Sequence, residues 1–178
     1  MNVLKNTKAY LAGNLENTVD SQNWRTYVSD KLSVRGIKSL SPVEMTLVNQ
    51  VGENDEDRLR LKKERSEGKY DEVSSYMKTV VQKDLRLIDL SDFLIINLEL
   101  SKPTYGTTHE LVVATQQKKP IFLSVGDKRE CPLWILGIIK HKYIYNNVDE
   151  ILTMIYQIDS GIKKIESSNW RLLLPEFR

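Results

Sequence analysis

Two carboxylates, Glu110 and Asp84, occupy positions in the sequence where a carboxylate can do chemistry. Glu110 follows the apolar run FLIINLE and the loop LSKPTYGTT, which predicts a place near the start of a helix at the carboxyl edge of a sheet. There a carboxylate is either stabilised by the helix dipole or available as a nucleophile. A carboxylate nucleophile can trap an oxocarbenium-like centre as a covalent ester.

Asp84 is unusual because it lies on or beside an apolar helical stripe that contains Met77, Val80 and Ile88. A carboxylate in such a position is costly unless it is paired or hydrogen-bonded. Two interpretations stay open. Asp84 is a boundary residue paired with Lys83, Arg86 or a nearby backbone N–H, or it is aimed into a cleft and transfers protons.

A pair of acidic groups at one cleft, one ionised and one able to carry a proton, is the minimum for breaking a glycosidic bond. In an N-glycosidic bond the departing ring nitrogen also benefits from protonation. Tyr10, at the end of the first expected strand, can orient a nucleophile by donating its O–H, or it is an ordinary half-buried strand residue.

Strand and helix patterns alternate about five times along the chain, which predicts an α/β fold with a parallel sheet covered on both faces. Right-handed crossovers restrict the topology to a doubly wound sheet. The expected strands are 8–12, 37–40, 93–98, 120–125 and 142–145, and the expected helices are 20–34, 73–90, 107–118 and 148–165. Residues 131–140 fit neither pattern clearly.

Ligands of doubly wound sheets bind at the carboxyl ends of the strands, near the switch point. We therefore expect the loops after Leu11, Leu40, Leu98 and Val125 to line the site.

The 178 residues predict a single domain over 1–178. Residues 52–72 form an insertion dense in both signs of charge, which is a solvated helix or mobile excursion, or else a lid. The tail at 166–178 has enough apolar residues to pack on its own domain or on a neighbouring subunit.

Composition excludes several classes of function. The net charge of +2 argues against binding to a nucleic acid polymer, and no apolar run is long enough to span a membrane. The chain also lacks a signal-peptide pattern, so we expect a cytoplasmic protein. A single cysteine, Cys131, and two histidines give no reason to expect a metal. The phosphate-binding motifs GxGxxG and GxxxxGK[ST] are absent, and we expect no cofactor.

Three segments of the chain form a recognisable series: KAYLAGN at 8–14, KDLRLIDLSDFLIINLE at 83–99 and PTYGTTHELVVATQQKKPIFL at 103–123. Through these segments the chain resembles the nucleoside 2-deoxyribosyltransferase family, which includes the 2′-deoxynucleoside 5′-phosphate N-hydrolases. They occur in the family's order and span about two thirds of the chain.

The resemblance implies a flavodoxin-like five-stranded sheet in a three-layer α/β/α arrangement. It implies that Glu110 is the nucleophile, that Asp84 handles the proton on the departing base, and that Tyr10 positions the nucleophile. It also implies a small nucleoside or nucleotide as substrate and a homodimer or larger oligomer. Together with the strand-edge argument, it leads us to expect substrate contacts from Gly13, Asn14, Pro42, Asn97, Thr104, Gly106 and Thr107. Gly106 is also expected to allow a tight turn before Glu110.

Departures from the family leave the sub-activity open between transfer and hydrolysis, and between nucleoside and 5′-monophosphate. Thr104 replaces the Asp or Ser that is frequent six residues before the nucleophile, and it can donate to a phosphate. The loop GNLENTVDSQN lacks the arginines of the nucleotide hydrolases.

Three other interpretations compete with this one. The segment PTYGTTHE is weakly similar to the motif PGGxGTxxE of the cytokinin-activating-type nucleoside 5′-monophosphate phosphoribohydrolases, so this activity is one alternative. A nucleotide-binding or sensing protein can use the same scaffold without turnover. A purely structural interaction domain would leave Asp84 and Glu110 far apart.

Overall fold

The computed structural model describes residues 2–14, 23–43, 55–102 and 105–164. Within these ranges a parallel sheet has the order β2-β1-β3-β4-β5. Its strands are β1 (Lys8–Gly13), β2 (Lys38–Leu40), β3 (Phe93–Asn97), β4 (Ile121–Ser124) and β5 (Ile144–Tyr145). This order confirms the predicted doubly wound, flavodoxin-like sheet, with its switch point between β1 and β3.

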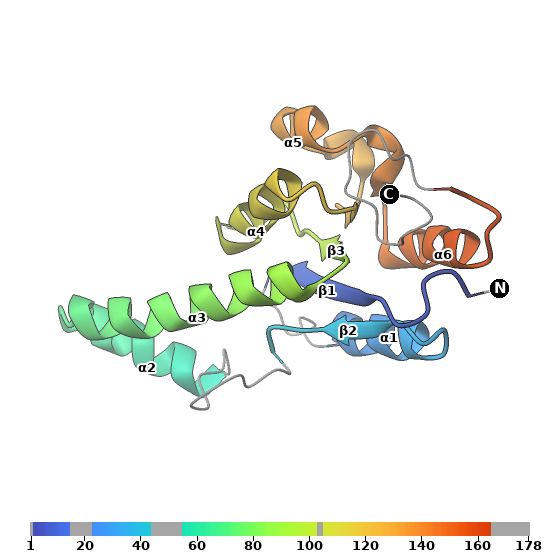
Figure 1. The fold of residues 1–178 in the computed structure, drawn as a ribbon. Helices are drawn as coiled ribbons and strands as arrows, with labels where there is room; N and C mark the ends of the chain where they lie inside the picture. The colour runs from blue at the N-terminus through green and yellow to red at the C-terminus, as the bar shows by residue number, and fades with distance from the viewer. Residues whose placement is uncertain (1, 15–22, 44–54, 103–104, 165–178) are drawn as a thin grey trace.

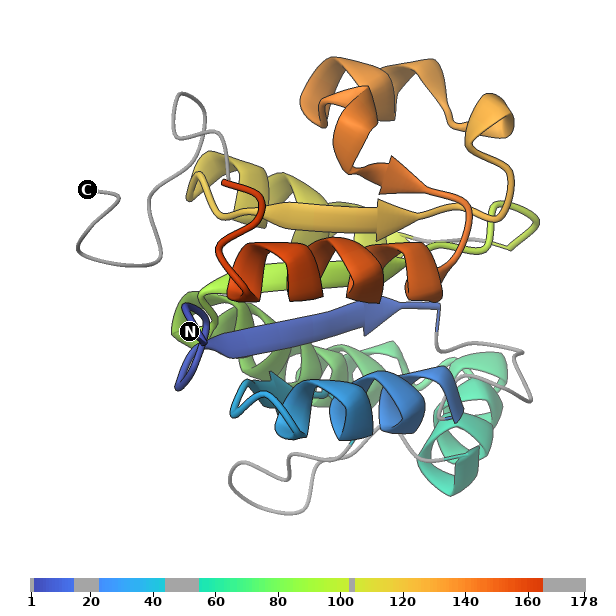
Figure 2. The same cartoon turned by 90° about the vertical axis from the view of Figure 1, so that its right-hand side faces the viewer.

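Helices cover both faces of the sheet, which gives the expected three layers (Figures 1 and 2). Helices α1 and α6 lie on one face, and α3 and α4 lie on the other. The helices are α1 (Asn23–Ser33), α2 (Asp55–Ser66), α3 (Tyr70–Leu90), α4 (Tyr105–Gln116), α5 (Leu133–Ile138) and α6 (Val148–Asp159). Short 3-10 turns occur at Lys128–Glu130 and His141–Tyr143.

Strand β3 lies at the centre of the core. Its first four residues, Phe93 to Ile96, are fully buried, as expected for a parallel strand covered on both faces. Phe122 of β4 packs edge-on against Phe93, with ring centroids 5.9 Å apart. The continuous apolar run in the sequence therefore reports burial on two faces.

The charged segment 52–72 contains helix α2, and α3 begins at Tyr70 rather than at residue 73. Gly68, with φ +81°, separates the two helices. Arg60 pairs with Asp57 and Glu64 and lies over the Tyr76 ring of α3 at 4.9 Å. From residue 55 onward the segment is thus a solvated helix packed on α3, and the two extend together past the sheet (Figure 1). Residues 52–54 lie outside the described ranges.

Other boundaries also differ from the expected ones. Helix α4 begins at Tyr105, so Gly106 has helical backbone and the expected tight turn at this glycine is wrong. Helix α6 ends at Asp159, followed by Gly161 with φ +74°, rather than at residue 165. The ambiguous segment 131–140 contains α5. The tail at 166–178 lies outside the described residues.

None of the described helices combines the length and apolar character needed to cross a membrane.

Candidate active site

A hydrogen bond between Tyr10 and Glu110 is the centre of the candidate site. The Tyr10 O–H donates to Oε1 of Glu110 at 2.6 Å, joining β1 to α4. Tyr10 is fully buried and Glu110 is 9% exposed. The structure therefore brings together two residues that lie 100 positions apart in the sequence.

Glu110 lies in the second turn of α4, because this helix begins at Tyr105. The interpretation of Glu110 as a first-turn carboxylate held by the helix dipole is therefore wrong, since that effect fades within the first turn. A nearly buried carboxylate at this position needs another reason, and the short hydrogen bond from Tyr10 provides part of it.

Electrostatics connect Tyr10 to the second carboxylate. Burial raises the pKa of Tyr10 well above its ordinary value, and the negative charges of Glu110 and Asp84 raise this pKa further. The positive charge of Arg25 opposes the shift. Tyr10 consequently keeps its proton at neutral pH and remains a hydrogen-bond donor. Glu110 and Asp84 therefore both lie near enough to Tyr10 to act on the same phenol.

Asp84 lies on α3 with its side chain 13% exposed. Its Oδ1 is 3.7 Å from the Nζ of Lys83, whose own side chain is 5% exposed. The expected pairing of Asp84 with Lys83 is therefore present. The Lys83 Nζ also donates to the carbonyl oxygen of Pro42 at 2.9 Å, which ties α3 to the loop after β2.

Gly13 and Asn14 organise the switch point between β1 and β3. A Cβ on Gly13 would lie 2.6 Å from the carbonyl oxygen of Asn97, so only glycine fits this crowded position. The Asn14 side-chain amide donates to the Glu99 carbonyl oxygen at 3.3 Å and accepts from the Glu99 N–H at 3.1 Å. These contacts fix the two loops relative to each other. Substrate contact by Gly13 and Asn14 stays a prediction.

The remaining expected binding residues differ in accessibility. Asn97 is half-buried at the end of β3, and its Oδ1 accepts from the Ser124 hydroxyl at 2.7 Å. Pro42 and Thr107 are buried, whereas Gly106 is exposed and a Cβ there would meet open space. Thr104 lies outside the described residues. Substrate binding by this set remains untested.

Arg25 is a buried cation near the site that was not among the expected site residues. It is 1% exposed, and it donates to the carbonyl oxygens of Leu11 at 3.2 Å and Gly13 at 2.9 Å. Its guanidinium also lies 4.6 Å from the centroid of the Trp24 ring. Arg25 thus supports the carboxyl end of the strand that carries Tyr10.

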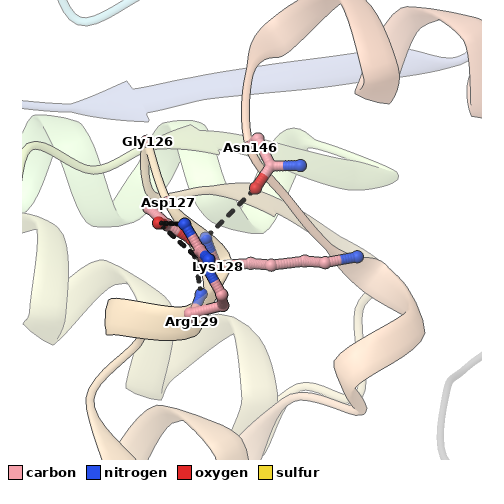
Figure 3. Close-up of a pocket in the computed structure, with 5 residues that line it drawn as sticks. All are labelled: Gly126, Asp127, Lys128, Arg129 and Asn146. Atoms are coloured by element: carbon pink, nitrogen blue, oxygen red, sulfur yellow. Dashed lines mark hydrogen bonds and ion pairs between the residues drawn. The ribbon is translucent and has the colours of Figure 1, made fainter.

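The loop after Val125 lines an open pocket of about 380 Å³ beside the ends of β4 and β5 (Figure 3). Its lining residues are Gly126, Asp127, Lys128, Arg129 and Asn146. Arg129 lies 2.6 Å from Asp127 and lowers the pKa of that carboxyl to about 2, so the two charges compensate each other. The pocket lining does not include Tyr10, Asp84 or Glu110. Among the described residues, no cluster of three or more histidine, cysteine or acidic side chains could hold a metal ion.

The fold and the site together define a flavodoxin-like α/β protein in which two carboxylates act on one buried tyrosine. The family model described as nucleoside 2-deoxyribosyltransferase matches residues 9–163, and the chain belongs to this family. Family and fold together support a nucleoside deoxyribosyltransferase-type enzyme.

Solved structures agree with this fold. The 2-deoxyribosyltransferase of the psychrotolerant bacterium Bacillus psychrosaccharolyticus aligns with a TM-score of 0.58 at 18% identity, covering 82% of this chain and 90% of that one. A conserved protein from Enterococcus faecalis V583 aligns with a TM-score of 0.54 at 17% identity, covering 85% and 98%. The search of curated proteins returned no match.

Proposed function

We propose that this protein cleaves or transfers at the N-glycosidic bond of a deoxyribonucleoside or ribonucleoside, or of its 5′-monophosphate, through a glycosyl ester on Glu110. The observation that carries the proposal is the 2.6 Å hydrogen bond from Tyr10 to Glu110. It holds one oxygen of a nearly buried carboxylate, so that the other oxygen can attack in a fixed orientation.

In the first step Oε2 of Glu110 forms a bond to the anomeric carbon, and the electron pair of the C1′–N bond leaves with the base. Asp84 gives its proton to the departing base, which lowers the negative charge that the leaving nitrogen must carry. In the second step the oxygen of water or a nitrogen of another base attacks the anomeric carbon, and the bond to Oε2 breaks and releases the Glu110 carboxylate. The proton of the attacking group passes to Asp84. Hydrolysis and transfer differ in the acceptor alone.

Tyr10 orients the nucleophile in this scheme. Because the pKa of Tyr10 is raised, the phenol donates its hydrogen bond throughout the neutral range instead of adding a negative charge beside Glu110. The same donor stabilises the Glu110 carboxylate when the ester is cleaved and the negative charge returns.

The test is base release from a panel of nucleosides and 5′-monophosphates. Deoxy and ribo forms are compared with and without an added acceptor base, and Glu110→Ala is the control. We expect release that is lost in Glu110→Ala. Acceptor dependence separates transfer from hydrolysis. Binding without release across the whole panel, by a folded protein, would contradict the proposal and favour a nucleotide-binding protein. A preference for ribose monophosphates would favour a phosphoribohydrolase.

We also propose that the chain works as a homodimer or larger homo-oligomer, as its family membership suggests. Sedimentation equilibrium tests this proposal, and a monomer at assay concentration would contradict it.

A further inference from the structure

Lys83 is a buried cation that the reaction scheme above does not use. Its side chain is 5% exposed, although a lysine is rarely buried unless it is paired. On α3 it belongs to the buried stripe that also contains Val80 and Leu87. A lysine that packs inward among apolar residues needs polar partners to offset the loss of hydration.

Two partners meet the Lys83 ammonium group. The carbonyl oxygen of Pro42, in the loop after β2, accepts at 2.9 Å. The carboxylate of Asp84 lies 3.7 Å away on the same helix. The ammonium group therefore connects the candidate proton-handling carboxylate to a loop at the carboxyl edge of the sheet.

The geometry points to Lys83 as a positioning residue that holds the Asp84 carboxyl group in place and stabilises the negative charge that this group acquires when its proton passes to the departing base. This inference rests on the proposed function, because it concerns how Asp84 handles the proton of the departing base. An ammonium group at this distance, shielded from water, favours the charged carboxylate. It also opposes the repulsion that Glu110 exerts on a second negative charge near Tyr10.

Other charged groups near α3 have contacts of their own. The charges of Asp84 and Glu110 raise the pKa of Tyr10 on β1, and the charge of Arg25 on α1 lowers it. At the N-terminal end of α3, Arg60 of α2 lies over Tyr76 and pairs with Asp57. At the C-terminal end, the Asp89 carboxylate accepts from Gln117, the residue after α4, and the Lys119 ammonium donates to the carbonyl oxygen of Asp89. Lys83 is thus a buried cation in direct contact with Asp84, which makes it the group to vary.

The experiment measures kcat and KM for base release as a function of pH in Lys83→Met, Lys83→Gln and Lys83→Arg. Arg86→Met is the matched control, because Arg86 lies on the same helix with its side chain 63% exposed. We expect kcat to fall about tenfold or more in the two uncharged variants, a fraction of what a proton-transfer group contributes. In the plot of kcat against pH, one limb reports the titration of Asp84. We expect this limb to move to higher pH by about 1 unit or more in the two uncharged variants.

The direction of this shift follows from the charge. Removal of a cation makes the carboxylate easier to protonate, so the limb moves to higher pH whether the ionised or the protonated form is active. Lys83→Arg should restore the position of the limb, and Arg86→Met should leave the profile unchanged. Asp84→Asn identifies the limb, because that limb disappears in this variant.

Three outcomes would overturn the inference. One is an unchanged profile in folded Lys83→Met and Lys83→Gln. The second is a shift of equal size in Arg86→Met. The third is failure of both uncharged variants to fold while Lys83→Arg folds, which would make the residue structural. Failure of the proposed function is a separate result, because the wild-type protein would then release no base from any substrate.

Discussion

The hydrogen bond from Tyr10 to Glu110 determines what the residues of the candidate site can do. Tyr10→Phe removes the donor and keeps the ring, which lies in a fully buried position. A hydrogen bond to a charged group contributes about 1.5–3 kcal/mol, so we expect kcat to fall by about 10- to 100-fold. Steady-state kinetics test this expectation, with thermal unfolding as a check on folding. An unchanged kcat would mean that Tyr10 does not orient the nucleophile.

The raised pKa of Tyr10 also makes stability depend on pH. The unfolded phenol titrates near pH 10, whereas burial and two carboxylates raise the pKa of the folded one. The protonated form therefore favours the folded state. Its full contribution is present below about pH 10 and is lost as the pH rises towards the folded pKa.

We expect the free energy of unfolding to decrease above about pH 10 in the wild type. The slope should be smaller in Tyr10→Phe, which lacks the titrating group. Urea unfolding at a series of alkaline pH values measures both slopes. Identical slopes would contradict the electrostatic account of Tyr10.

Residue types and spacings identified some of these side chains and missed others. Asp84 was found because a carboxylate beside an apolar stripe is unusual. The same rule identifies Arg25, which shares a helical stripe with Val28 and Leu32, and Lys83, which shares one with Val80 and Leu87. Their partners are backbone carbonyls of distant segments, and these depend on tertiary structure that no local pattern reports.

At the scale of elements, two glycines at the edge of the site differ in what they allow. A Cβ on Gly13 would lie 2.6 Å from the Asn97 carbonyl oxygen, whereas a Cβ on Gly106 of α4 would meet open space. We expect Gly13→Ala to destabilise the fold by about 1–3 kcal/mol through overpacking. Chemical denaturation measures this change. An unchanged free energy of unfolding in Gly13→Ala would show that β1 and β3 can move apart without loss of stability.

Gly106→Ala is the contrasting change, because alanine favours a helix over glycine by about 0.5–1 kcal/mol. We expect equal or higher stability. If substrate contacts this exposed position of α4, as the sequence analysis predicts, KM should rise. Increased stability with an unchanged KM would remove Gly106 from the set of substrate-binding residues.

Element types were more predictable than element boundaries. The apolar run from Phe93 to Ile96 identifies a buried central strand. Gly36, with φ +71°, follows α1, as glycine commonly does after the C-terminus of a helix. Helix α4 begins at Tyr105, two residues before the start at 107 that the sequence predicts. This small error moved Glu110 from the second turn into the first and changed the physical explanation of its burial.

At the scale of the whole molecule, parallel strands bring residues of distant sequence to one edge. Tyr10 and Glu110 meet because β1 and α4 are adjacent across the switch point, which the order β2-β1-β3-β4-β5 creates. The alternating pattern predicts a doubly wound parallel sheet, whereas the flavodoxin-like arrangement and the approach of Tyr10 to Glu110 are implied by the family resemblance. The position of α2 was not predictable in the same way, because its contacts with α3 include the Arg60–Tyr76 pair rather than a clear apolar face.

The central claim is a covalent glycosyl ester on Glu110, and mass spectrometry of the protein during turnover tests it most directly. The enzyme is quenched in acid after brief incubation with a substrate from the panel, digested and sequenced by fragmentation. We predict one added glycosyl group on the peptide that contains Glu110, and none in Glu110→Ala. A glycosyl group on another residue, or undiminished base release by Glu110→Ala, would contradict the account.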